Sequence, residues 1–166
     1  MVRESLIEHV GSLPVVATTI YPYLKDDDID LGEALVMLAI HDIGELVTGD
    51  KITFAKNDDE EEIEQAAAIK LLSPAYHDLY NRIEHAKEGD KTAQFAKSID
   101  KITPDFLDYL TPPEITMKRY KDYMDTDTPE QIIQLKIDHK LSKMTWDPTL
   151  HALFEFLLDK NLKKLK

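Results

Sequence analysis

The stretch Leu31–Asp50 reads LGEALVMLAIHDIGELVTGD and decides the fold. It contains the run ALVMLAI, which is apolar nearly all round, as is typical of a buried helix. Asp30 precedes this run and is a candidate N-cap. Gly44 and Gly49 then open the chain into a turn-rich segment. We therefore expect a central buried helix from Leu31 to about Asp42.

Apolar residues recur at helical spacing through most of the remaining chain. Four prolines, at positions 74, 113, 129 and 148, stand at or near expected helix starts, where a missing N–H costs nothing. We expect a first helix over Glu4–Tyr23, which Gly11 and Pro14 should weaken or kink, and another from about Asp58 that Pro74 closes. The other helices that we expect are Ala75–Lys87, Lys91–Leu110, Pro113–Met124, Pro129–Ser142 and Pro148–Leu165. No convincing strand pattern is present. The prediction is an all-α fold, a single-domain compact bundle of six to eight helices spanning residues 1–166.

Composition excludes several kinds of site. The 166 residues include no cysteine, so disulfides and thiolate metal ligands are excluded, and any metal must be held by nitrogen and oxygen. No run of about 18 apolar residues exists, which predicts a soluble, cytoplasmic protein. The 32 acidic and 20 basic residues give a net charge of −12, which opposes binding to nucleic acid or to an anionic membrane. A small anionic substrate would need positive charge at its binding site, and a bound cation is the obvious source of that charge.

The adjacent pair His41-Asp42 follows the apolar run directly. A buried helix would thus deliver an imidazole and a carboxylate to one place, and buried charge is costly unless it is paired or bound to metal. At a frayed C-terminal turn both side chains can reach a common point, where a divalent cation accepts mixed nitrogen and oxygen ligands. The alternative is a surface-facing helix end, where the dipole favours the histidine and water solvates the aspartate.

Further ligand-type residues accompany this pair along the chain. His9 lies 32 positions before His41, in the string ESLIEHV, and Asp100 lies 58 positions after Asp42, in FAKSIDKI. Two carboxylates, Glu45 and Asp50, follow the pair at short spacing.

The order His … His-Asp … Asp resembles that of the HD-domain superfamily of metal-dependent phosphohydrolases. The resemblance is closer still to the nucleotidase branch, which includes the bacterial 5′-deoxynucleotidases and the HD-domain-containing protein 2 group. The matching strings are EH at positions 8–9, HDxxE…TGD at 41–50 and DK at 100–101. The match covers roughly residues 1–110, and residues 111–166 add helices without a recognised motif. The resemblance implies one divalent metal ion (Mn, Co, Mg, Zn or Fe) in an HD-type helical fold, and related proteins are often homodimers.

The resemblance also implies a role for each matched residue. The implied metal ligands are His9, His41, Asp42 and Asp100. Glu45 matches a catalytic carboxylate that acts in general acid/base chemistry, and Asp50 matches a carboxylate that assists it near the sugar end. Arg3 lies close to where an arginine commonly precedes the ES…EH string, which suggests contact with the substrate phosphate. Lys101 matches the lysine that often follows the ligand aspartate, and it receives no role.

Some HD enzymes bind a second metal through two more histidines, and this chain has His77 and His85 in the corresponding interval. Eight positions apart on one helix, they would be about 12 Å apart at a rise of about 1.5 Å per residue. That separation is too large for metals about 4 Å apart. We interpret both as surface or packing histidines and favour one metal.

The expected activity is release of phosphate from a nucleoside or deoxynucleoside 5′-monophosphate. Two alternatives stay open. The same metal could serve a nucleotide pyrophosphohydrolase or phosphodiesterase, a reading that a wide basic pocket would favour. The chain could instead be a non-catalytic HD module with a structural metal or a sensed ligand, although such a module needs neither Glu45 nor Asp50.

Overall fold

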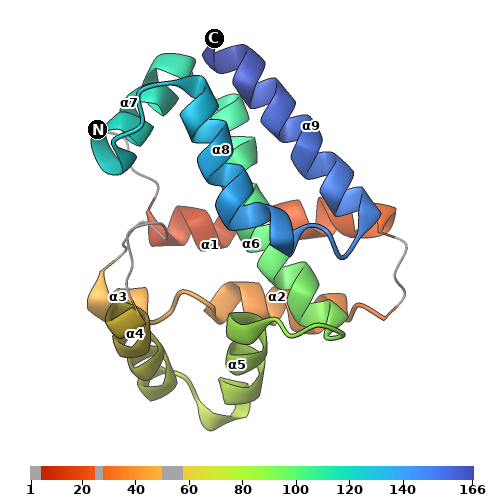
Figure 1. The fold of residues 1–166 in the computed structure, drawn as a ribbon. Helices are drawn as coiled ribbons and strands as arrows, with labels where there is room; N and C mark the ends of the chain where they lie inside the picture. Colours follow the sequence, from red (N-terminus) through yellow and green to blue (C-terminus); the bar gives the residue numbers. More distant parts are fainter. Residues whose placement is uncertain (1–4, 25–27, 50–57) are drawn as a thin grey trace. The chain divides into compact units, whose positions relative to one another are not determined.

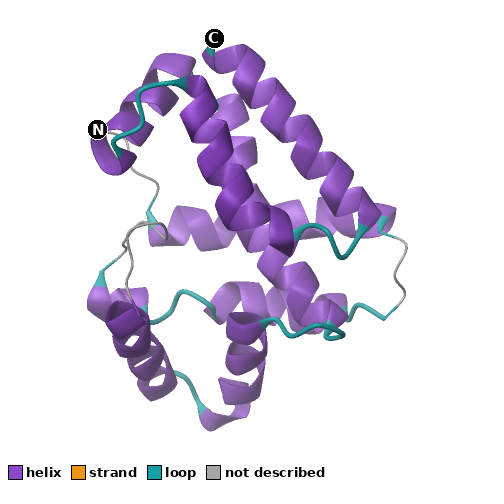
Figure 2. Cartoon of the chain, in the orientation of Figure 1, coloured by secondary structure: helices purple, strands orange, loops and turns teal. Residues whose placement is uncertain are grey.

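The computed structural model describes residues 5–24, 28–49 and 58–166, and within these ranges every regular element is helical (Figures 1 and 2). Eight α-helices of nine or more residues are present there, together with the four-residue helix α3. The all-α fold and the expected number of helices are therefore confirmed.

The chain divides into two compact units. The first consists of Met1–Pro22 and Asp26–Ile99, and the second of Tyr23–Lys25 and Asp100–Lys166. Helix α6 (Lys91–Leu110) belongs to both, because the division falls between Ile99 and Asp100. The single domain expected over residues 1–166 stays a prediction.

The first unit begins with α1 (Leu6–Ile20), which packs against α2 (Leu31–Ile40). Ser5 and Glu8 form a capping box at the start of α1: the Glu8 N–H donates to Ser5 Oγ at 3.2 Å, and the Ser5 N–H donates to Glu8 Oε2 at 2.8 Å. The helix continues through Gly11 and Pro14 as one element and then tightens into the 3₁₀ turn η1 (Tyr21–Tyr23). Gly11 and Pro14 therefore do not divide α1 into two helices.

Helix α2 starts where the sequence predicts. Asp30 is its N-cap and accepts a hydrogen bond from the Glu33 N–H at 2.9 Å. Ala34, Met37 and Leu38 are fully buried, at the i, i+3, i+4 spacing of one helix face. The helix ends at Ile40, so that His41 is its C-cap and Asp42 stands in the following turn.

The remaining elements of the first unit complete its core. They are α3 (Glu45–Thr48), α4 (Asp58–Leu71), the 3₁₀ turn η3 (Pro74–Tyr76) and α5 (His77–His85). Ala68, Leu72 and Tyr80 form a buried cluster that Ile40 and Ile43 cover. Arg82 of α5 adds a polar connection, donating to Glu33 of α2 at 2.7 Å and to Asp90, before α6, at 2.8 Å.

The second unit contains the C-terminal part of α6 together with α7 (Pro113–Met124), α8 (Pro129–Lys140), the 3₁₀ turn η4 (Leu141–Lys143) and α9 (Pro148–Leu165). Helices α6, α7 and α9 have the predicted bounds. Prolines at N1 and side-chain caps from Thr128 and Asp147 mark the starts of α8 and α9. Its buried apolar side chains include Ile132, Phe154 and Leu157, and the carboxylates of Asp105 and Asp108 are buried as well.

Candidate metal centre

His9 lies in the first turns of α1, immediately after the capping-box residue Glu8. The capping box fixes where α1 begins, and its first turns place His9 on the helix. Glu8 of the EH string therefore has a structural role, holding the start of the helix that carries the histidine. The pKa of the Glu8 carboxyl is lowered by its hydrogen bonds from Ser5.

His41 and Asp42 lie where α2 ends and its last turn opens. The His41 side chain is buried, whereas that of Asp42 is about one-fifth exposed, at 21%. The ring Nδ1 of His41 lies 3.0 Å from the carbonyl oxygen of Leu38. Because a carbonyl only accepts, Nδ1 must carry the proton of that hydrogen bond, and Nε2 of the neutral ring presents its lone pair.

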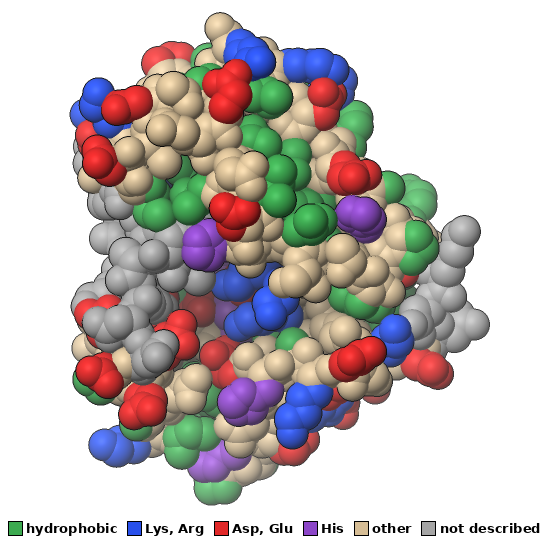
Figure 3. All heavy atoms as spheres, viewed as in Figure 1, with side chains coloured by type: hydrophobic (Ala, Val, Ile, Leu, Met, Phe, Trp, Pro, Cys, Tyr) green, Lys and Arg blue, Asp and Glu red, His purple; other side chains and the backbone are tan. Residues whose placement is uncertain are grey.

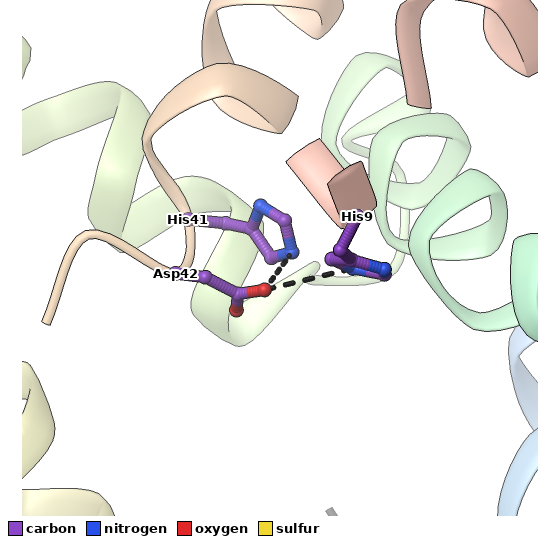
Figure 4. Close-up of side chains that lie close together, drawn as sticks. All are labelled: His9, His41 and Asp42. Carbon is purple, nitrogen blue, oxygen red and sulfur yellow. Dashed lines mark ion pairs between the residues drawn. The ribbon is translucent and has the colours of Figure 1, made fainter. Parts of the chain in front are cut away.

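Both histidines face the same carboxylate oxygen (Figure 4). His41 Nε2 lies 3.0 Å and His9 Nε2 lies 3.6 Å from Asp42 Oδ2. One ligand atom from each of the three residues falls within 4.8 Å of the others. The residues that the sequence predicts as ligands from this unit are therefore brought together.

These separations fit a shared cation. Ligand bonds of about 2.1 Å place neighbouring ligand atoms about 3.0 Å apart in an octahedron and about 3.4 Å apart in a tetrahedron. A lone pair on His41 Nε2 that faces Asp42 Oδ2 at 3.0 Å would be repelled unless a proton or a cation lay between them. Two imidazole nitrogens and a carboxylate oxygen form a donor set that Zn²⁺, Mn²⁺, Fe²⁺ and Co²⁺ accept.

Glu45 opens the short helix α3 directly after the turn, and it is 9% exposed. Helix α3 ends at Gly49, whose φ of 78° is a conformation that glycine adopts readily, and the Gly49 N–H donates to the Glu45 carbonyl oxygen at 2.8 Å. Glu45 is thus held next to Asp42, with carboxylate oxygens of Asp42, Glu45 and Glu64 within 4.8 Å of one another.

Glu64 of α4 is a site residue that our sequence prediction did not include. Glu64 stands in the acidic run at the start of α4, which suits the helix dipole and gives Glu64 no special place in the sequence. A signal was present, because Glu64 precedes the buried residues Ala67 and Ala68 by three and four positions. A carboxylate on the buried face of a helix needs a partner.

A family model described as "HD domain" matches residues 1–140. The chain belongs to the HD-domain family. A predicted metal-dependent phosphohydrolase from Magnetospirillum magnetotacticum MS-1, of known crystal structure, is similar, with 25% sequence identity and a TM-score of 0.73. The match covers 99% of this chain and 87% of that one. No significant match to a curated protein is found.

The remaining expected ligand of this HD domain, Asp100, lies on α6 at the start of the second unit. It is 6% exposed, and its Oδ2 lies 3.0 Å from Lys101 Nζ. Its inclusion in the metal site with His9, His41 and Asp42 stays a prediction from the resemblance. Arg3 and Asp50 lie outside the described residues.

His77 and His85 stand at opposite ends of α5. His77 Nε2 lies 3.2 Å from the Leu72 carbonyl oxygen, and His85 is exposed. Neither belongs to a cluster suited to a metal ion among the described residues. The expectation of one metal stays a prediction.

No helix within the described ranges has the length and apolarity required to cross a membrane. Acidic and basic side chains are both distributed over the face drawn in Figure 3.

Proposed function

We propose that this HD-domain protein is a metal-dependent phosphohydrolase that releases phosphate from a nucleoside or deoxynucleoside 5′-monophosphate. The observation that carries the proposal is the convergence of His9 and His41 on Asp42 Oδ2, at 3.6 and 3.0 Å. The similarity to a predicted metal-dependent phosphohydrolase supports the same reaction class. The choice of a nucleoside monophosphate rests on the resemblance of the EH, HDxxE…TGD and DK strings to the nucleotidase branch.

In this proposal His9, His41, Asp42 and Asp100 hold one divalent ion. When bound, such an ion acts as a Lewis acid on the attacking water and neutralises charge on the phosphoryl group. His41 is oriented for this task by the Leu38 carbonyl oxygen, since a hydrogen bond at Nδ1 directs the Nε2 lone pair toward Asp42.

Glu45 handles the proton in the proposed reaction. Its carboxylate lies close to that of Asp42, at the metal centre, and is nearly buried. A carboxylate in this place takes the proton of the attacking water or returns one to the leaving alkoxide oxygen. We propose that Asp50 assists near the sugar and that Arg3 binds the phosphate, as the resemblance implies. A cytoplasmic location and a homodimer complete the proposal.

The experiment measures phosphate release from a panel of nucleoside and deoxynucleoside monophosphates, with hydrolysis of dinucleotides and nucleoside triphosphates assayed alongside. Chelator-treated protein is assayed before and after addition of Mn²⁺, Co²⁺, Mg²⁺ or Zn²⁺, and metal binding is measured in parallel. We expect release only with added metal. Tight metal binding without release from any substrate would instead identify a non-catalytic module. Activity confined to dinucleotides or nucleoside triphosphates would identify a pyrophosphohydrolase or phosphodiesterase.

A further inference from the structure

Tyr80 of α5 is a buried polar residue of the first unit. Its side chain is 1% exposed and lies in the apolar cluster with Ala68 and Leu72. A buried tyrosine hydroxyl usually has a hydrogen-bond partner, because a buried polar group without one is costly. Within the described ranges no residue forms a hydrogen bond with the Tyr80 hydroxyl. The surroundings of the ring indicate what such a hydroxyl binds.

Two segments that carry site residues pack against the Tyr80 ring. Ala68 of α4 belongs to the same cluster, and Glu64 stands four positions before it on the same face of that helix. Ile43 also packs against this cluster and directly follows Asp42 in the chain. The ring is therefore held by the helix that carries Glu64 and by the turn that carries Asp42.

The hydroxyl end of this ring lies among negative charges. Burial raises the pKa of the Tyr80 hydroxyl, and the charges of Glu84, Glu64 and Asp42 raise it further. Glu84 lies on α5 itself and pairs with Lys97 of α6 at 3.7 Å. Glu64 and Asp42, by contrast, belong to the carboxylate cluster of the site. The hydroxyl stays protonated at neutral pH, so it is an uncharged hydrogen-bond donor close to this cluster.

The carboxylates of Asp42, Glu45 and Glu64 complement this donor. Oxygens of the three residues lie within 4.8 Å of one another, and ionised carboxylates only accept hydrogen bonds. A water molecule accepts the hydrogen of a hydroxyl and donates its own two hydrogens to carboxylate oxygens. One neutral donor beside several acceptors therefore suits a bound water molecule better than it suits an anion.

We propose that the Tyr80 hydroxyl binds the water molecule that attacks phosphorus, with Glu45 and Glu64 accepting the hydrogens of that water. This inference rests on the proposed function, in which Glu45 takes a proton from the attacking water. The water oxygen then forms its bond to phosphorus while the bond from phosphorus to the leaving oxygen breaks. A proton returned to the leaving oxygen gives an alcohol and inorganic phosphate. Tyr80 transfers no proton in this reaction and only positions the water oxygen.

A purely structural role for the hydroxyl predicts a different result. If Tyr80 only supports the packing of α4 and α5, loss of its hydroxyl changes the stability of the protein and leaves kcat unaltered. If the hydroxyl positions the attacking water, its loss lowers kcat. The KM and the metal content are then maintained, because the hydroxyl contacts neither the bound substrate nor the ion.

The test compares the wild type with Tyr80→Phe, which keeps the ring in the cluster and removes only the hydroxyl. Tyr76→Phe is the matched control, because Tyr76 stands four positions earlier and is 44% exposed. The first measurement is the crystal structure of each Mn²⁺-loaded protein, at a resolution that shows ordered water. The second is kcat and KM for the nucleoside monophosphate that the panel identifies. Metal content and unfolding temperature are recorded for each protein.

We expect a water molecule about 2.5–3.0 Å from Tyr80 Oη and from oxygens of Glu45 and Glu64 in the wild type and the control, and its loss in Tyr80→Phe. The kcat of Tyr80→Phe should be about tenfold to a hundredfold lower, with KM unchanged. A wild-type structure without this water, or an unaltered kcat in Tyr80→Phe, would overturn the inference. If the wild type hydrolyses no substrate, the proposed function fails, and the crystal structures alone decide whether Tyr80 binds water beside Glu45 and Glu64.

Discussion

The backbone of Gly44 lies directly against the backbone of Glu64. A Cβ atom added at Gly44 would collide with the Glu64 carbonyl oxygen and would approach its Cγ to 2.8 Å. The missing side chain lets α3 and α4 pack closely, and this contact carries the Glu64 carboxylate to the oxygens of Asp42 and Glu45. The glycine that follows the HD pair therefore shapes the acidic side of the metal centre.

Replacing this glycine should be costly. We expect Gly44→Ala to lower the free energy of unfolding by about 1–3 kcal/mol, as overpacking against a rigid backbone does. Gly11→Ala is the matched control, since no atom lies within 4 Å of its added Cβ on helix α1. The control should be neutral or more stable by about 0.5–1 kcal/mol. Urea unfolding measures both, and equal effects at the two positions would refute the packing argument.

Metal should stabilise the protein through Asp42. At a free metal concentration about 100 times the dissociation constant, a bound ion adds about 2.7 kcal/mol and raises the unfolding temperature by several degrees. Asp42→Asn should abolish this increase, because the oxygen that faces both histidines loses its charge. Asp138→Asn, on the exposed face of α8, is the control and should keep the increase. Thermal unfolding with and without chelator makes the comparison.

Glu45 should be needed for hydrolysis and dispensable for metal binding. We expect Glu45→Gln to reduce kcat by about 10²–10⁴-fold, the usual effect of a general acid/base. Metal content after dialysis should equal that of the wild type. Loss of metal would show that Glu45 ligates the ion together with Asp42 and Glu64, with which it shares a second cluster of oxygens.

Buried ion pairs between α6 and α8 should dominate the stability of the second unit. Lys136→Met leaves Asp105 and Asp108 buried without their shared cation, and we expect a loss of roughly 3–5 kcal/mol. Removing the exposed lysine in Lys163→Met should change stability by less than about 0.5 kcal/mol. Chemical denaturation distinguishes the two, and a small effect of Lys136→Met would mean that water replaces the ammonium.

Asp90 should make the first unit less stable in acid. Its hydrogen bonds from Arg82 hold the pKa of the Asp90 carboxyl below its ordinary value. The Asp90 carboxyl therefore binds a proton more readily in the unfolded chain than in the folded protein. The stability that the ionised carboxyl contributes is complete above about pH 4 and is lost as the pH falls through the folded pKa. Asp90 also caps the start of α6, since it accepts a hydrogen bond from the Ala93 N–H at 3.1 Å. Asp90→Asn keeps a capping side chain without this titration. Its stability deficit should be largest near neutral pH and should shrink in acid, and a deficit independent of pH would contradict the linkage.

Much of the helical architecture could be predicted because local chemistry marks the helix ends. Pro113, Pro129 and Pro148 each stand at the first residue of a helix, where the fixed φ and the missing N–H are both tolerated. Asp30 caps α2 as expected. The end of α8 is less sharply marked, since the helix tightens into a 3₁₀ turn after Lys140 without a proline or glycine to stop it.

The candidate site could be predicted only where ligand residues follow a recognisable order. His9, His41 and Asp42 fall into such an order, and the structure brings them together. Glu64 is marked in the sequence only by its spacing to Ala67 and Ala68, and its place at the site depends on the contact with Gly44. The buried ion pairs of Lys136 with Asp105 and Asp108 join α6 to α8, and they likewise exist only through tertiary packing.

The proposed function requires one divalent ion between His9, His41 and Asp42, with Asp100 as its fourth protein ligand. The most direct measurement is anomalous diffraction from crystals of the protein grown with Zn²⁺, recorded on both sides of the zinc edge. We predict one strong peak about 2.0–2.2 Å from Nε2 of both histidines and from a carboxylate oxygen of each aspartate. No peak between the two histidines, or a peak confined to Glu45 and Glu64, would contradict the account.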